Sequence, residues 1–334
     1  MAKAAIGQIC SSNSVAHNLE QCVKLVGQAA AVGAKVLFLP EASDYISTST
    51  QESFSLAKPV ATSPFVAGLR SAAAKHKLAV HVGIHVPVVV KPSTSTINSV
   101  LSSIAQSEDP DTIASVIDKK GEGDEPKIKL YNRTIYIRPD GVLDESALYN
   151  KLHLFDYPDA SLRESTTTQA GSSFTPPIDS PVGRLGSLIC FDLRFPEAAL
   201  RLTTSKVYPS PAQILLYPSA FTIPTGLAHW ETLLRARAIE TQSYVIASAQ
   251  VGRHNPGLSP RVSYGRSMVI DPWGRVLLTL KGVIKDDKKP KGEEYDAEEG
   301  AVGELGIVDI DLDEWEGVRK RMPLVRRTDV YNEV

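Results

Sequence analysis

The stretch Leu188-Ile189-Cys190-Phe191-Asp192-Leu193-Arg194-Phe195-Pro196-Glu197 decides how the rest of this chain is interpreted. Its apolar start is typical of a buried strand. Pro196 and Glu197 are typical of the first turn of a helix, because proline fits that turn and a carboxylate suits its positive end. Cys190 therefore stands where a strand ends and a helix begins. Backbone N–H groups point outward at such a place, so we expect a lowered thiol pKa and room for an oxyanion.

Two other polar residues follow apolar runs in the same way. Glu41 comes after Leu37-Phe38-Leu39-Pro40, and Lys151 follows the predicted strand 146–150. A carboxylate held beside apolar walls has a raised affinity for protons, which suits a general base. A lysine at the end of a strand can donate to a developing oxyanion. A carboxylate, an amine and a thiol in these positions indicate a site that cleaves amides.

Other interpretations stay open at this point. His153 could serve Cys190 as the base of a Cys–His pair, although nothing local distinguishes it from the other histidines. Each of the three residues also has an ordinary structural explanation when taken alone: a small core thiol, a solvated carboxylate or a surface lysine. Cys10 and Cys22 lack a strand-to-helix setting, and we expect them to be packing residues.

The composition is that of a globular protein with a sizeable core. The chain has 334 residues, 43% of them hydrophobic and 22% charged, and a formal net charge of −2. This balance argues against nucleic acid or a membrane surface as partner, and no apolar run reaches the roughly 18 residues of a spanning helix. Three cysteines are too few for a disulfide framework, and no signal-peptide pattern is present. We expect a cytoplasmic location and a small-molecule substrate.

Strand-like and helical patterns alternate along the chain, which predicts an α/β fold. Two hairpins, 134–149 and 267–280, turn at Asp-Gly and Pro-containing segments, so the sheets should be mixed. These features favour a four-layer αββα sandwich of two mixed sheets flanked by helices. The expected strands are 4–9, 35–39, 78–90, 213–217, 244–250 and 305–310, and the expected helices are 18–32, 64–77, 226–241 and 313–321.

Two polar segments interrupt this pattern. Residues 91–129 are rich in Ser, Asp and Lys, with a short element conceivable at 112–117, and residues 281–300 are almost entirely charged or small. We expect both to be solvated, mobile surface insertions in a single domain that spans 1–334.

Taken together, the motifs resemble those of the nitrilase superfamily of carbon–nitrogen hydrolases. The segments that carry the resemblance are Phe38-Leu39-Pro40-Glu41-Ala42, Tyr149-Asn150-Lys151-Leu152-His153-Leu154-Phe155 and the cysteine segment. The resemblance implies an αββα sandwich, a homodimer, and no metal or organic cofactor. It also implies a catalytic triad of Glu41, Lys151 and Cys190, with Glu164 as a second glutamate that positions the lysine and the substrate.

Within the superfamily the chain is most similar to the Nit branch, and there to deaminated glutathione amidases. Further segments add to this likeness: Pro40-Glu41-Ala42-Ser43-Asp44-Tyr45, Tyr217-Pro218-Ser219-Ala220-Phe221-Thr222, Ala228-His229-Trp230-Glu231, 234–242 and 264–274. The implied reaction is a metabolite repair. Deaminated glutathione is hydrolysed to 2-oxoglutarate and cysteinylglycine through a cysteine thioester. The segment 91–129 is longer than this branch leads us to expect.

The resemblance also suggests how substrate is bound. The backbone N–H of Phe191 would help Lys151 to hold the oxyanion, and Arg194 would bind the α-keto acid carboxylate through a bidentate contact, unless it forms a salt bridge to Glu197 instead. The residues expected to line the acyl pocket are Tyr45, Phe195, Phe221 and Thr222.

Two alternatives remain. The chain could be an ω-amidase that acts on 2-oxoglutaramate, because the two substrates share the same acyl half. It could also be a non-catalytic binding protein that keeps the fold, although four retained polar site residues argue against this.

Overall fold

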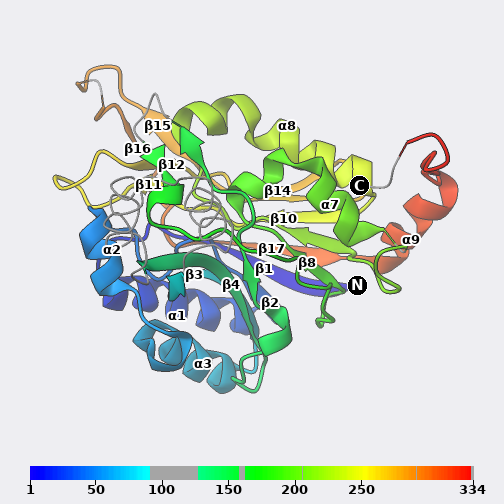
Figure 1. The fold of residues 1–334 in the computed structure, drawn as a ribbon, viewed down its shortest axis with the longest axis horizontal. Helices are drawn as coiled ribbons and strands as arrows, with labels where there is room; N and C mark the ends of the chain where they lie inside the picture. Colours follow the sequence, from blue (N-terminus) through cyan, green and yellow to red (C-terminus); the bar gives the residue numbers. More distant parts are fainter. Residues whose placement is uncertain (91–126, 158–161, 205, 291, 332–334) are drawn as a thin grey trace, which may run out of the picture.

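The computed structural model describes residues 1–90, 127–157, 162–204, 206–290 and 292–331 of the chain. Two mixed sheets lie face to face in it, and helices cover both outer faces (Figure 1). The helices α1 (Val15–Ala31) and α3 (Pro64–His76) lie on one side, and α7 (Pro196–Thr203) and α8 (Ile223–Thr241) lie on the other. The predicted αββα sandwich is therefore confirmed.

The first sheet has six strands in the order β17-β1-β2-β3-β4-β5. Strands β1, β2 and β3 are parallel to one another, and the other pairings are antiparallel. The bounds are β1 (Ala2–Gln8), β2 (Val36–Phe38), β3 (Ala79–Val90), β4 (Lys127–Ile137), β5 (Tyr149–Asn150) and β17 (Glu304–Ile310).

The second sheet has five strands in the order β14-β13-β10-β9-β8. Its parallel part is β8-β9-β10, and β13 and β14 are antiparallel neighbours. The bounds are β8 (Leu185–Ser187), β9 (Ile214–Leu216), β10 (Tyr244–Ala247), β13 (Met268–Ile270) and β14 (Val276–Thr279). Each sheet thus carries a short parallel part whose strands end at the same edge.

Three apolar cores fill the spaces between the four layers. Successive side chains of a strand point to opposite faces, so each sheet contributes to two cores. In the first sheet, Ala5 and Leu37 pack against helices α1 and α3, whereas Ile6 and Phe38 face the second sheet. Residues of the second sheet that pack under α7 and α8 include Leu215, Val245 and Ala247.

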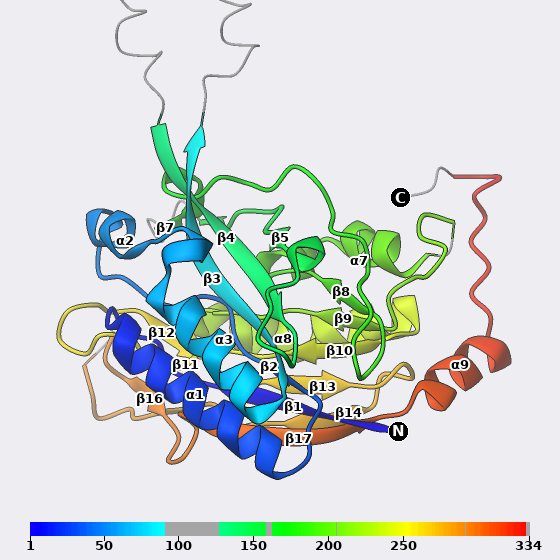
Figure 2. The ribbon, with the colours of Figure 1, turned by 90° about the horizontal axis from the view of Figure 1, so that it is seen from below.

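The helix ends follow ordinary capping rules. Ser14 and Ser63 accept hydrogen bonds from His17 N–H and Val66 N–H, and so cap α1 and α3. Figure 2 shows α1 and α3 side by side along the outer face of the first sheet. The other described elements are α2 (Thr50–Leu56), α9 (Leu312–Arg321), the 3-10 helices η1 (Val60–Thr62), η2 (Glu145–Ala147), η4 (Glu164–Thr166) and η5 (Cys190–Arg194), and the strand pairs β6 (Asp156–Tyr157) with β7 (Leu162–Arg163) and β11 (Val251–Arg253) with β12 (Val262–Tyr264).

The two polar segments differ from the prediction where they are described. Residues 127–129 belong to β4 and pair with Val88 to Val90 of β3, while 91–126 lie outside the described residues. Segment 281–300 contains the hairpin of β15 (Val283–Lys285) and β16 (Tyr295–Ala297), so the expectation of a loop without structure is wrong here. This hairpin packs on β11, where the guanidinium of Arg253 donates to the carbonyl of Tyr295 over 3.0 Å.

No helix in the described ranges combines the length and the apolar character that crossing a membrane requires.

Candidate active site

Three polar side chains meet where strands of both sheets end. Glu41 follows β2 of the first sheet, Cys190 follows β8 of the second sheet, and Lys151 follows β5. All three side chains are buried, with exposed fractions of 5% for Glu41, 2% for Lys151 and 9% for Cys190. The predicted strand before Lys151 is shorter than expected, because a 3-10 helix (η2) takes up residues 145–147. The site is thus assembled from both sheets.

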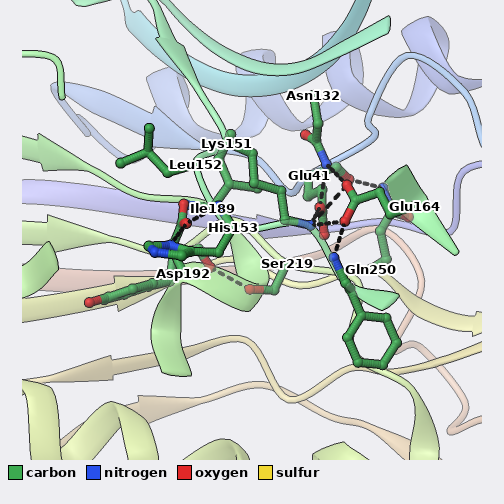
Figure 3. A network of polar contacts seen from close by, with 12 residues as sticks. Glu41, Asn132, Lys151, Leu152, His153, Glu164, Ile189, Asp192, Ser219 and Gln250 are labelled. Carbon is green, nitrogen blue, oxygen red and sulfur yellow. Dashed lines mark hydrogen bonds and ion pairs between the residues drawn. The ribbon is translucent and has the colours of Figure 1, made fainter. Parts of the chain in front are cut away.

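The ammonium group of Lys151 lies between two carboxylates (Figure 3). Its Nζ is 3.1 Å from Oε1 of Glu41, and 3.1 and 2.9 Å from Oε1 and Oε2 of Glu164. Oε2 of Glu164 also accepts the backbone N–H of Phe155 over 2.8 Å. The structure therefore brings together Glu41, Lys151 and Glu164, as the sequence predicts.

Asn132 of β4 completes this cluster. Its Nδ2 donates to Oε1 of Glu41 over 2.6 Å and to Oε1 of Glu164 over 3.2 Å. Its backbone carbonyl accepts the N–H of Lys151 over 2.9 Å. Asn132 could not be predicted as a member of the site, because an asparagine inside a strand carries no local signal of such a role.

The charges of Glu41 and Lys151 each stabilise the ionised form of the other side chain. Burial acts to lower the pKa of Lys151, but the charges of Glu164 and Glu41 and the nearby Cys190 raise this pKa well above its ordinary value. Burial acts to raise the pKa of Glu41, yet Lys151 and hydrogen bonds from Cys190, Asn132 and Lys151 bring it below the ordinary value. The expected raised proton affinity of Glu41 is therefore wrong, because its partners outweigh its apolar walls.

Cys190 occupies a strained turn. Its φ is +47°, in the left-handed region that residues other than glycine seldom adopt, and its N–H donates to the carbonyl of Pro218 over 3.0 Å. The 3-10 helix η5 begins at Cys190, and α7 begins only at Pro196. Pro196 and Glu197 lie in the first turn of α7, as predicted. Cys190 is not next to the start of α7, however, because the 3-10 helix η5 lies between them.

The surroundings of Cys190 favour the protonated form of its thiol. Burial raises the pKa of Cys190 above its ordinary value, and the charge of Glu41 adds to this effect, while Lys151 and the N–H of Ala220 act in the opposite direction. The expected lowered thiol pKa is therefore wrong, because desolvation and the carboxylate outweigh the local N–H groups. A thiol in this state needs a base, and Glu41 is its hydrogen-bond partner.

Two backbone N–H groups lie near the sulfur. The N–H of Ala220 interacts with the Cys190 thiol. The N–H of Phe191 donates to no group of the described chain, although the next N–H along η5, that of Asp192, bonds to the carbonyl of Ile189 over 2.9 Å. An unpaired N–H beside a nucleophile is suited to an oxyanion.

The backbone of Glu41 is held on two sides. A Cβ atom on Gly83 of β3 would lie 2.6 Å from the Cα atom of Glu41, so only glycine allows this approach. Nε2 of Gln250 donates to the carbonyl of Glu41 over 2.9 Å. The next residue, Ala42, has a φ of +54°. The position of Glu41 is therefore fixed by close packing as well as by its side-chain partners.

His153 is engaged elsewhere. Its Nδ1 is 2.7 Å from Oδ1 of Asp192, and its ring stacks on Phe195 with 3.6 Å between ring centroids. Asp192 is fully buried and also accepts the hydroxyl of Tyr149 over 2.7 Å. The side chain that is hydrogen-bonded to the Cys190 thiol is Glu41, not His153. Asp192 and His153 instead connect the turn of Cys190 to the segment that carries Lys151.

Arg194, Phe221 and Thr222 are three of the residues expected to bind substrate. Arg194 donates from Nη2 to Nδ1 of His229 over 2.8 Å and forms no ion pair with Glu197, and its Nε is buried without a partner. Burial lowers the pKa of Arg194 below its ordinary value. The ring of Phe221 packs on Trp230 in the same core as Cys190, and Thr222 is the N-cap residue that precedes α8.

Tyr45 contacts residues outside the Glu41–Lys151–Cys190 cluster. Its ring stacks on His85 with 4.5 Å between centroids, and its hydroxyl donates to the carbonyl of Ser53 over 3.0 Å. The nearby Asp44 accepts the Nδ1–H of His85 over 3.0 Å. Tyr45 makes no hydrogen bond to Glu41, Lys151 or Cys190 among the described contacts. A role in binding substrate stays a prediction for this residue and for Arg194, Phe195, Phe221 and Thr222.

The described residues contain no group of three or more His, Cys, Asp or Glu side chains placed to hold a metal ion. Between Glu41 and Glu164, the position that a cation would take is filled by the ammonium of Lys151.

Comparison with known proteins agrees with the geometry. The model of the carbon–nitrogen hydrolase family matches residues 3–101 and 92–320. A Schizosaccharomyces pombe protein named probable hydrolase nit2 is 38% identical over 335 residues, which cover 99% of each chain. The human deaminated glutathione amidase is 33% identical over 98% of this chain and 83% of its own length.

Solved structures show the same fold. The Caenorhabditis elegans NitFhit protein superposes with a TM-score of 0.72 at 34% identity, covering 99% of this chain and 67% of that one. Saccharomyces cerevisiae Nit3, described as a member of branch 10 of the nitrilase superfamily, superposes with a TM-score of 0.67 at 26% identity, covering 98% and 96%.

The fold and the buried carboxylate–ammonium–thiol cluster define a hydrolase of carbon–nitrogen bonds. The chain belongs to the carbon–nitrogen hydrolase family, in the Nit branch of the nitrilase superfamily, and it is an amide-hydrolysing enzyme.

Proposed function

We propose that this enzyme hydrolyses deaminated glutathione to 2-oxoglutarate and cysteinylglycine through a thioester on Cys190. One observation carries the proposal: the Cys190 thiol is hydrogen-bonded to the buried carboxylate of Glu41, and Nζ of Lys151 lies 3.1 Å from Oε1 of the same carboxylate. This arrangement supplies a nucleophile, its base and a positive charge in one place. Several relatives that are 33–37% identical bear the name deaminated glutathione amidase, which supports the choice of substrate.

In the acylation step, Glu41 takes the proton of Cys190 while the sulfur attacks the amide carbonyl carbon. The carbonyl oxygen becomes an oxyanion next to the ammonium of Lys151 and the N–H of Phe191. Glu41 then gives its proton to the leaving nitrogen, the carbon–nitrogen bond breaks and cysteinylglycine departs. The 2-oxoglutaryl group remains on Cys190 as a thioester.

Deacylation uses the same groups. Glu41 takes a proton from water, the hydroxide adds to the thioester carbonyl, and the same donors hold the new oxyanion. The carbon–sulfur bond breaks, 2-oxoglutarate leaves and the proton on Glu41 returns to Cys190. Glu164 keeps Lys151 in place throughout, because its two oxygens bond only to the ammonium, to Asn132 and to the Phe155 N–H.

Recognition of the acyl half falls to residues near the thiol. Arg194 belongs to η5, the helix that Cys190 begins, and its guanidinium can bind the α-keto acid carboxylate once His229 yields one N–H group. Phe195, Phe221, Thr222 and Tyr45 are the remaining residues that we assign to the pocket. We also propose that the enzyme acts as a cytoplasmic homodimer without a cofactor, which the family resemblance and its three free cysteines support.

The test is to measure release of 2-oxoglutarate from deaminated glutathione and from 2-oxoglutaramate in parallel, with wild type, Cys190→Ala and the control Cys10→Ala. We expect a higher kcat/KM for deaminated glutathione, and a loss of about 10⁴-fold or more for Cys190→Ala alone. A preference for 2-oxoglutaramate would instead establish an ω-amidase. An active Cys190→Ala variant would overturn the mechanism.

A further inference from the structure

Asn132 contacts every polar member of the cluster around Lys151. Its two side-chain N–H groups go to Glu41 and Glu164, over 2.6 and 3.2 Å, and its backbone carbonyl takes the N–H of Lys151. Figure 3 shows the amide nitrogen of Asn132 turned toward the two carboxylates. The side chain is 5% exposed, so both N–H groups act where water does not compete.

The two oxygens of Glu41 have different partners. Oε1 accepts from both Asn132 Nδ2 and Lys151 Nζ, which uses the two lone pairs of a carboxylate oxygen. Oε2 accepts no hydrogen bond from these two residues. The thiol of Cys190 is hydrogen-bonded to the same carboxylate, and Oε2 is the oxygen that Asn132 and Lys151 leave open for a proton.

We propose that Asn132 is a positioning residue of the reaction: it binds Oε1 of Glu41 together with Lys151, so that Oε2 is the oxygen that exchanges the proton with Cys190. This inference rests on the proposed function of Glu41 as the base. It adds one residue to the Glu–Lys–Cys site and assigns separate tasks to the two oxygens of Glu41. Asn132 also donates to Glu164, so one amide group holds both carboxylates beside the ammonium of Lys151.

The unpaired oxygen of Asn132 shows which way its amide group is held. Oδ1 is buried and has no hydrogen-bond partner in the described structure, and an unsatisfied buried carbonyl destabilises a fold. The amide cannot turn over to relieve this, because Oδ1 would then face two carboxylates. The amide is therefore held in this orientation by its two donor contacts to Glu41 and Glu164.

Two variants test the inference. Asn132→Leu removes both donors at similar volume, and Asn132→Asp removes them and adds a third carboxyl group beside a single ammonium. Without these donors the ionised form of Glu41 is less favoured, so it takes up a proton at higher pH. We expect the acid limb of kcat/KM to move upward by about one to two pH units in Asn132→Leu, and further in Asn132→Asp.

Thr134→Val is the matched control. Thr134 is on the same strand two residues away, is fully buried, and also has an unpaired oxygen, but it touches neither carboxylate. We expect this variant to keep the wild-type pH profile. We also expect Asn132→Leu to unfold at a urea concentration no lower than that of Thr134→Val. If Asn132 had a purely structural role, Asn132→Leu would be less stable and the acid limb of its kcat/KM profile would not move.

The same profile can be measured without a substrate. Alkylation of Cys190 by iodoacetamide, followed by peptide mass mapping, should show the same upward shift of its acid limb in both Asn132 variants. Unchanged limbs in both variants would overturn the role of Asn132 and leave the amidase proposal intact. An active Cys190→Ala variant would overturn the amidase proposal itself, so the two failures are distinguishable.

Discussion

Lys151 carries its positive charge on a buried side chain, and its two carboxylate partners depend on that charge. Replacing it with Met leaves Glu41 and Glu164 buried without a counter-ion. Removal of one partner of a buried ion pair costs about 3–5 kcal/mol. We expect Lys151→Met to lower the free energy of unfolding by that amount and to remove activity, as measured by urea denaturation and by 2-oxoglutarate release.

The matched control is Lys129→Met. Lys129 is partly buried, and its Nζ donates to the carbonyl of Ser165 over 2.8 Å, not to a carboxylate. Its loss should change stability by less than about 1 kcal/mol. Equal effects of the two substitutions would show that the charge of Lys151 is not what the site requires.

At the same scale, the sequence identified the polar residues but not their electrostatics. Glu41, Lys151 and Glu164 could be predicted to meet because two of them follow apolar runs and the third matches a family motif. The directions of the pKa shifts at Glu41 and Cys190 could not be predicted, because they depend on partners distant in the chain. Asn132 is 91 residues from Glu41, and no spacing rule connects them.

At the scale of elements, strand β3 and the segment after β2 are in unusually close contact. A Cβ at position 83 would lie 2.6 Å from the Cα atom of Glu41, which is backbone and cannot move aside cheaply. We expect Gly83→Ala to displace Glu41 from Cys190, to reduce kcat by about 10²-fold, and to lower the free energy of unfolding by about 1–3 kcal/mol.

Gly27→Ala is the comparison, because glycine in the interior of α1 has only ordinary contact distances, with 3.6 Å to the His76 ring. Alanine favours a helix over glycine by up to about 1 kcal/mol, so this variant should be as stable as wild type or more so, and fully active. Steady-state kinetics and thermal unfolding compare kcat and stability in the two variants. Normal kcat in Gly83→Ala would contradict the close approach.

The elements themselves were largely predictable. Apolar periodicity located the strands that became β1, β2, β3, β9, β10 and β17, with ends shifted by at most three residues. The hairpin of β15 and β16 was missed because its stability comes from packing on β11, a tertiary contact, and not from its own charged sequence. The short helix η5 was also missed, since the left-handed φ of Cys190 leaves no mark on residue composition.

At the scale of the whole molecule, two buried histidines connect stability to pH. Burial lowers the pKa of His81 and of His254 to about 3. In the unfolded chain a histidine takes up a proton below about pH 6.5, so the unfolded state binds more protons between pH 6.5 and 3. Stability therefore falls as the pH falls, by about 1.4 kcal/mol per pH unit for each histidine.

His81→Gln tests this linkage. His81 lies between the two sheets, where its Nε2 is 3.3 Å from the hydroxyl of Ser187. Urea unfolding at several pH values between 6.5 and 5 should give a slope that is lower by about 1.4 kcal/mol per pH unit in the variant. His17→Gln, on the exposed face of α1, should keep the wild-type slope. Equal slopes in all three proteins would exclude His81 as a source of acid sensitivity.

The burial that raises the pKa of the Cys190 thiol also affects how the enzyme withstands oxidants. Hydrogen peroxide and other small oxidants attack thiolates far faster than thiols. A sulfur that is held as a thiol resists conversion to sulfenic acid while no substrate occupies the site. The burial and the Glu41 carboxylate, which make the thiol dependent on a base, are thus also expected to slow the oxidation of Cys190.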